Sequence, residues 1–303
     1  MSIFPTKILF ATDGSRDAEL AATTAVGLAM VSGSELHVVT AAEEYPHYEA
    51  YWPLAEHSRQ LAQAVLDKQV KRIKNLGGTL DQHYLRIGTA AEEVVSLAQE
   101  IGAGLVAMGS RGRGRIRRLA MGSVSDSVVR HAHCPVMVVR WKPVVFPAKI
   151  LLANDGSKEA ALAAQIAADL ARSTDSELHV VSVAAEYPYV SETYYAVGRA
   201  EEAERTRQET QKVLEEQMQK VGEAGANIAT SHLKVGAVDE EIVVLAEEEG
   251  TDLIVVGSRG LGGVRRALMG SVSDSVVRHA HCPVLVVRPQ KTSTAQHEAT
   301  PVT

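Results

Sequence analysis

Two glycine-rich segments of this chain have the residue types and the spacing to bind phosphate groups. In each, a Gly-Ser-Arg-Gly sequence is followed nine residues later by a Gly-Ser pair: Gly109–Gly112 with Gly122-Ser123, and Gly257–Gly260 with Gly270-Ser271. Glycine lets backbone N–H groups approach an anion closely and adopts positive φ without strain. The Gly-Ser pairs are expected where helices begin, and the unpaired N–H groups of a helix N-terminus attract phosphate. The sequence therefore predicts two phosphate sites built mainly from backbone amides.

Serine hydroxyls near each helix start add further donors. Ser123 and Ser125 lie in the first segment, and Ser271 and Ser273 repeat them in the second. Ser123 is interpreted as a helix N-cap, because Asp126 follows three residues later. The alternative is that these are ordinary turn glycines before a capped helix. Neither a Gly-Lys pair nor a full G-x-G-x-x-G occurs in these loops, which excludes two familiar phosphate motifs.

Both segments belong to a repeat that spans a whole domain. KILFATDGS at Lys7–Ser15 returns as KILLANDGS after an offset of 142 residues, and MGSVSDSVVRHAHCPV at Met121–Val136 returns unchanged after 148. The second copy therefore carries six extra residues, which lie between Pro188 and Arg207. We expect a first domain at 1–140, a linker at 141–148, a second domain at 149–288 and a disordered tail at 289–303.

Apolar runs alternate with helical patterns in each copy. In the first, strands are expected at 7–12, 35–40, 79–85, 105–108 and 135–140, and helices at 18–30, 58–76, 91–99 and from 123 onward. This alternation predicts an α/β fold, with a parallel sheet covered by helices on both faces. Ligands of such sheets bind beyond the carboxyl ends of the strands, where the strand order reverses.

The combined motifs resemble the universal stress protein family, in particular its ATP-binding branch. The resemblance rests on G-x₂-G-x₉-G-[ST], on Asp13 and Asp155 after the first strand of each copy, and on the closing PVxVV strand. It covers both copies and leaves out only the linker and the tail. It implies two tandem Rossmann-like domains of the adenine nucleotide alpha hydrolase-like type, each a five-stranded parallel sheet in the order 3-2-1-4-5. Asp13 would then face the glycine loop across adjacent strands.

The same resemblance implies ATP as the ligand, with Mg²⁺ as an optional companion ion. Asp13 and Asp155 would contact the ribose or the Mg²⁺, and backbone groups of Val38 and Val180 would face the adenine. The triphosphate would be held by Gly109, Gly112, Gly122, Ser123 and Ser125, and in the second copy by Gly257, Gly260, Gly270, Ser271 and Ser273. The alternative for Asp13 is a purely local role in the DGS turn.

Three functions fit these residues. The leading prediction is a nucleotide-dependent regulator of the stress response with one ATP site per domain and little or no catalysis. The second is a slow ATPase or phosphotransferase that uses Mg²⁺ bound by Asp13 and Asp155, although no general base is apparent. The third is an interaction module with degenerate pockets. The intact spacing in both copies argues against the third.

Two other clusters allow alternative readings. The basic cluster at Arg111–Arg118 suits RNA or a triphosphate. We favour the triphosphate and expect no nucleic-acid partner, because the net charge is −6 and the second copy is less basic. The HAHC sequences at His131–Cys134 and His279–Cys282 suit a partial metal site or the end of a helix before proline. The helix end is favoured, because no further Cys/His set is evident.

The remaining expectations concern contacts and location. The tyrosine-rich stretches at Tyr45–Trp52 and Tyr187–Tyr195 are read as lids or contact surfaces, with contacts favoured. The two PVxVV strands are expected to pair antiparallel within the chain, which covers their edges and places Cys134 and Cys282 too far apart for a disulfide. Association into a homodimer and an unidentified regulatory partner are compatible with the family. No apolar run approaches the ~18 residues of a membrane span and no secretory signal is apparent, so a cytoplasmic location without membrane contact is expected.

Overall fold

The computed structural model describes residues 5–46, 49–112, 121–145, 147–185, 196–223, 226–260 and 269–289. The first domain contains β1 (Lys7–Ala11), α1 (Arg16–Ser32), β2 (Glu35–Ala42), the short 3₁₀ turn η1 (Glu49–Tyr51), α2 (Trp52–Asn75), β3 (Gln82–Ile87), α3 (Ala90–Glu100), β4 (Leu105–Gly109), α4 (Ser123–His131) and β5 (Val136–Val139). The second contains β6 (Lys149–Ala153), α5 (Lys158–Thr174), β7 (Glu177–Ala185), α6 (Ala196–Glu223), β8 (Ile228–Gly236), α7 (Val238–Glu248), β9 (Leu253–Gly257), α8 (Ser271–His279) and β10 (Val284–Val287).

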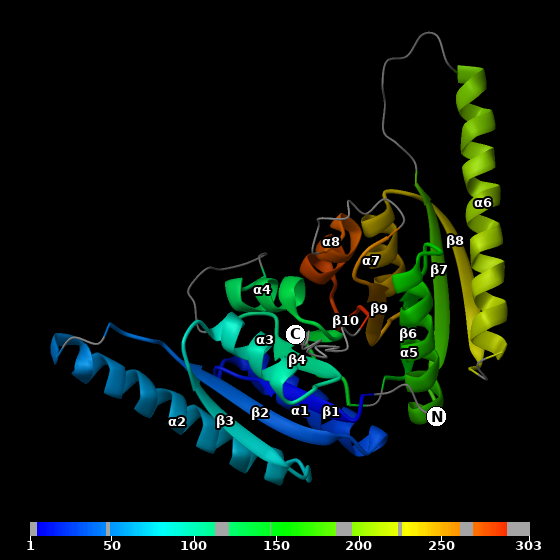
Figure 1. Ribbon diagram of the computed structural model, residues 1–303. Helices are drawn as coiled ribbons and strands as arrows, with labels where there is room; N and C mark the ends of the chain where they lie inside the picture. Colours follow the sequence, from blue (N-terminus) through cyan, green and yellow to red (C-terminus); the bar gives the residue numbers. More distant parts are fainter. Residues whose placement is uncertain are drawn as a thin grey trace, which may run out of the picture.

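The strands form one sheet that runs through both domains (Figure 1). Its ten strands follow the order β3-β2-β1-β4-β5-β10-β9-β6-β7-β8, so each domain has the predicted order 3-2-1-4-5, and strand pairing within each domain is parallel. The order reverses between β1 and β4, where Ala11 lies opposite Met108. The carboxyl end of β1 and the loop after β4 therefore meet, which is the position where ligands bind in such sheets.

The last strands of the two domains join the halves. β5 and β10 pair antiparallel, with Leu285 opposite Met137 and both residues almost fully buried. The predicted pairing of the PVxVV strands within the chain is confirmed. Each strand would otherwise be an apolar sheet edge open to pairing with another chain.

Helices cover both faces of the sheet, as predicted. The core on one face is formed with α1, α2, α5 and α6, and the core on the other with α3, α4, α7 and α8. Small buried residues such as Ala21, Ala22 and Ala25 allow α1 to approach the sheet closely. α2 and α6 lie at the far ends of the molecule, whereas α4 and α8 face each other near its centre (Figure 1).

Two predicted boundaries were wrong. α2 begins at Trp52 rather than 58, because Pro53 occupies the first turn, where proline is compatible with a helix. The end of the Tyr45–Trp52 stretch is thus the start of an exposed helix. β3 begins at Gln82 rather than 79. Just before it, the Asp81 carboxylate accepts a hydrogen bond from the backbone N–H of Leu36 (2.8 Å), so a side chain takes the place of a backbone acceptor where the pairing of β2 with β3 starts.

Other sequence predictions fall outside the described residues. These include the whole Tyr187–Tyr195 stretch, most of the Arg111–Arg118 cluster and the tail beyond Pro289. Over the residues that are described, no helix has the length and apolar character needed to cross a membrane.

Candidate functional site

A pocket lies in the first domain at the carboxyl ends of β1, β2 and β4. Its volume is about 570 Å³, within the usual range of small-molecule sites. Its lining consists of Ala11, Thr12, Asp13, Ala18, Val39, Ala41, Ala90, Val94, Met108, Gly109, Arg111, Gly112, Met121, Gly122, Ser123, Val124, Ser125, Asp126 and Arg278. The structure thus brings together the predicted first-domain residues except Val38, and adds an apolar wall and an arginine from the second domain.

The polar end of the pocket is the N-terminus of α4. Gly122, not Ser123, is the N-cap, and no side chain caps this helix. α8 repeats the arrangement with Gly270. α1, by contrast, is capped by Ser15, whose hydroxyl accepts a hydrogen bond from the N–H of Ala18. The first N–H groups of a helix have no intrahelical acceptor, so a glycine N-cap leaves those of α4 available to an anion.

The predicted capping role of Ser123 was therefore wrong. Ser123 is the first helical residue and lies exposed at the pocket. The carboxylate expected to complete its capping box, Asp126, forms ion pairs with arginines instead.

Ser125 fixes the loop next to the helix. Its buried hydroxyl donates a hydrogen bond to the carbonyl of Ser110 (2.7 Å) and lies 2.9 Å from the carbonyl of Gly122. Ser273 makes the equivalent contacts with Ser258 and Gly270, each at 3.1 Å. These serines hold the glycine loop against the start of the helix.

Gly109 has no room for a side chain, whereas Gly112 and Gly260 lie against the end of an aspartate side chain. A Cβ on Gly109 would lie 2.6 Å from the backbone N of Ala18 in α1, and one on Gly112 would lie 2.5 Å from Oδ2 of Asp13. In the second domain, a Cβ on Gly260 would lie 2.3 Å from Oδ2 of Asp155. None of the six motif glycines has a positive φ, so that part of the sequence argument was wrong.

Asp13 takes the local role in the DGS turn and also lines the pocket. One carboxylate oxygen accepts a hydrogen bond from the N–H of Ser15 (3.0 Å), which forms the DGS turn. The other lies beside Gly112, and the residue lines the pocket. Asp155 and Ser157 repeat the turn at the same distance, 3.0 Å.

The apolar wall comes from residues that sequence reasoning missed. Val39 and Ala41 of β2 line the pocket, whereas the side chain of Val38 is buried in the core on the opposite face. Val180 and Val181 divide between the two faces in the same way. Side chains alternate along a strand, so knowing that α4 covers the Val39 face identifies the residues that line the pocket. The predicted backbone contacts of Val38 and Val180 with adenine stay a prediction.

Comparison with known proteins agrees with this arrangement. The family model described as "Universal stress protein family" matches residues 5–140 and 148–288. This chain belongs to the universal stress protein family. A relative from Mycobacterium tuberculosis, universal stress protein Rv2005c, is 30% identical over 296 residues, which cover 93% of this chain and 96% of the relative.

A solved universal stress protein shares the fold of the whole chain. The crystal structure of one from Archaeoglobus fulgidus covers 93% of this chain and 98% of its own, with 24% identity and a TM-score of 0.68. A smaller universal stress protein, described as a complex with cAMP, covers 45% of this chain and 97% of its own, with 26% identity and a TM-score of 0.38.

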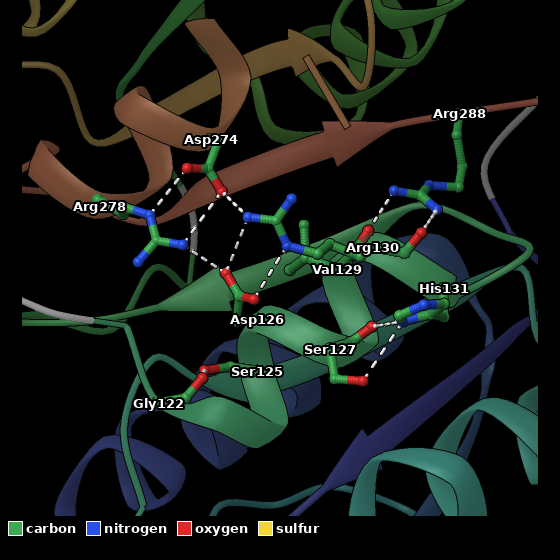
Figure 2. Close-up of polar contacts among 10 residues, drawn as sticks. All are labelled: Gly122, Ser125, Asp126, Ser127, Val129, Arg130, His131, Asp274, Arg278 and Arg288. Carbon is green, nitrogen blue, oxygen red and sulfur yellow. Dashed lines mark hydrogen bonds and ion pairs between the residues drawn. The ribbon is translucent and has the colours of Figure 1, made fainter. Parts of the chain in front are cut away.

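In this universal stress protein, the repeated sixteen-residue passage forms the contact between α4 and α8 (Figure 2). Arg130 pairs with Asp126 of its own helix (2.9 Å) and with Asp274 of α8 (2.7 Å), while Arg278 pairs with Asp274 (2.9 Å) and with Asp126 (2.5 Å). We call these four residues the interdomain ion cluster. Each carboxylate thus lies between two guanidinium groups.

Two further arginines connect the halves. Arg288, which follows β10, donates to the carbonyls of Arg130 (3.1 Å) and Val129 at the end of α4 (Figure 2). It also donates to the carbonyl of Ala132 (2.7 Å). Arg140, which follows β5, donates to the carbonyls of Val277 (3.4 Å) and Arg278 at the end of α8. Burial lowers the pKa of both guanidinium groups, but their reference pKa is so high that they stay charged at neutral pH.

The HAHC sequences end helices, as predicted. α4 ends at His131 and α8 at His279, and both cysteines behind them are free and buried. Burial raises the pKa of Cys134 and Cys282 to about 12, so both are protonated near neutral pH and are poor nucleophiles. Within the described part of the chain, no group of three or more His, Cys, Asp or Glu residues is arranged to hold a metal ion.

Proposed function

We propose that this universal stress protein binds ATP, one molecule per domain, and acts as a nucleotide-dependent regulator of the stress response. The observation that carries the proposal is the uncapped N-terminus of α4, which opens into a pocket of about 570 Å³ beside an apolar wall. Such a site offers amides to phosphates at one end and van der Waals contact to a flat base at the other.

The residues of the pocket fit the parts of the nucleotide. The N–H groups that follow Gly122 would bind the polyphosphate, and Val39 and Ala41 would contact the adenine. Asp13 would contact the ribose or a Mg²⁺ ion accompanying the phosphates, where the metal would neutralise phosphate charge. The repeated cap and turn geometry at Gly270 and Asp155 supports a second site. Homodimer formation and a regulatory partner stay predictions.

Binding and turnover are tested together. Isothermal titration of the purified chain with ATP is expected to give two sites per chain, and incubation with Mg²⁺-ATP is expected to release little ADP over hours. Turnover that requires Mg²⁺ and is lost in Asp13→Ala and Asp155→Ala would instead favour the slow ATPase or phosphotransferase. Absence of binding at millimolar ATP would contradict the proposal.

A further inference from the structure

One lining residue of the first-domain pocket comes from the second domain. Arg278 lies in α8, and yet it lines the pocket together with Asp126 of α4. Its guanidinium reaches the pocket across the interface, where one N–H donates to Oδ1 of Asp126 at 2.5 Å. The side chain is 29% exposed, so it is open to a bound ligand.

The negative charge of Asp126 needs a positively charged partner if a polyphosphate is to bind next to it. Asp126 is in the first turn of α4, next to the amides proposed to bind phosphate, and it is one of the residues that line the pocket. An uncompensated carboxylate there would repel a polyphosphate. Arg130 and Arg278 both pair with Asp126, and of these two arginines Arg278 is the one that lines the pocket.

The rest of the interdomain ion cluster offers an internal comparison. Arg130 has the same chemistry, pairs with the same two carboxylates and has a similar exposure of 33%, but it is not part of the first-domain pocket lining. The two arginines therefore contribute alike to the contact between α4 and α8 and differ in their relation to this pocket.

We propose that Arg278 binds the polyphosphate of the nucleotide held by the first domain, so that the second domain completes that site. This inference rests on the proposed function and adds to it that the two domains do not bind independently. Arg130 pairs with Asp274 of α8 as Arg278 pairs with Asp126 of α4, so Arg130 would bind the polyphosphate at the site of the second domain. Two intact copies of the passage would then be needed because each supplies an arginine to the other's ligand.

The test uses the full chain carrying Gly270→Asp, which blocks the second site as argued in the Discussion. Titration with ATP is expected to show an affinity about tenfold lower or more in Arg278→Ala, whereas Arg130→Ala changes it less than about threefold. The loss should be smaller with AMP than with ATP, because AMP places fewer phosphate charges near the guanidinium. Arg278→Lys keeps the charge and should restore most of the affinity.

The reciprocal chain gives an independent check. With Gly122→Asp blocking the first site, the roles reverse, and Arg130→Ala rather than Arg278→Ala weakens ATP binding. If Arg278→Ala unfolds the chain, Arg278→Gln removes the charge while retaining hydrogen-bonding groups. Equal effects of the two arginine variants, or an equal loss for AMP and ATP, would overturn the inference and leave the proposed function intact. Failure of the Gly270→Asp parent to bind ATP would overturn both.

Discussion

A Gly122→Asp chain is expected to bind one ATP instead of two while remaining as stable as the original protein. Gly122 is the N-cap of α4 with φ −68° and ψ 151°, a conformation that any residue adopts. A Cβ there would meet its nearest neighbours at 3.4 Å, so the side chain fits. An aspartate at an N-cap accepts hydrogen bonds from the amides of the first turn, which are the groups proposed to bind phosphate.

The expected loss is large because two effects combine. The capping carboxylate occupies the amides and adds a negative charge next to the polyphosphate, which together should lower the affinity of that site by about 100-fold or more. Helix stability should change by only a few tenths of a kcal/mol, in favour of aspartate. Native mass spectrometry counts the nucleotides, and thermal unfolding without ligand measures the stability.

Matched variants separate capping from bulk. Gly122→Ala adds the same Cβ without a capping oxygen and should keep ATP binding within a few-fold. Gly270→Asp should remove the other nucleotide, and the double aspartate variant should bind none. Retention of two tightly bound ATP molecules by Gly122→Asp would mean that the α4 amides do not hold phosphate.

The second large effect is expected at the interface, where Arg288→Ala should lower the free energy of unfolding by about 2–5 kcal/mol. The Arg288 side chain is buried and donates to carbonyls at the end of α4. Its removal leaves those carbonyls without donors and creates a cavity between the domains. Arg140→Ala, its counterpart at the end of α8, should have a similar effect.

Urea unfolding monitored by circular dichroism measures these changes. Arg205→Ala is the control, because Arg205 lies on α6 with a side chain that is 70% exposed and that pairs with the equally exposed Glu209 at 3.8 Å. This substitution should lower the free energy of unfolding by less than about 1 kcal/mol. An Arg288→Ala chain no less stable than Arg205→Ala would show that the arginine contacts do not stabilise the domain pair.

The sequence predicts most of the fold because its signals are local and repeated. The apolar runs, the alternation with helices and the two PVxVV strands are each visible in the letters, and the strand order follows from the family resemblance. The starts of α2 and β3 are less predictable, because they depend on Pro53 within a helical first turn and on the bond from Leu36 to the Asp81 side chain. The first of these is local, whereas the second joins residues far apart in the chain.

The candidate site is likewise predictable from the sequence only in part. The glycine-rich loops and Asp13 can be found from motif spacing. The difference between Val38 and Val39 depends on which face of the sheet carries α4. The contribution of Arg278 depends on how the two domains meet, and no spacing within one copy reveals it. The reason for glycine at 109 is likewise tertiary, because the backbone atoms that exclude a Cβ belong to α1.

The central claim is that backbone amides at the starts of α4 and α8 hold the phosphates of an adenine nucleotide, and amide NMR of the ¹⁵N-labelled chain tests it most directly. On titration with ATP, the signals of Ser123–Ser125 and Ser271–Ser273 are expected to shift most and to saturate together with binding. AMP should shift them less. Saturable ATP binding that leaves both sets of amides unshifted would contradict the account.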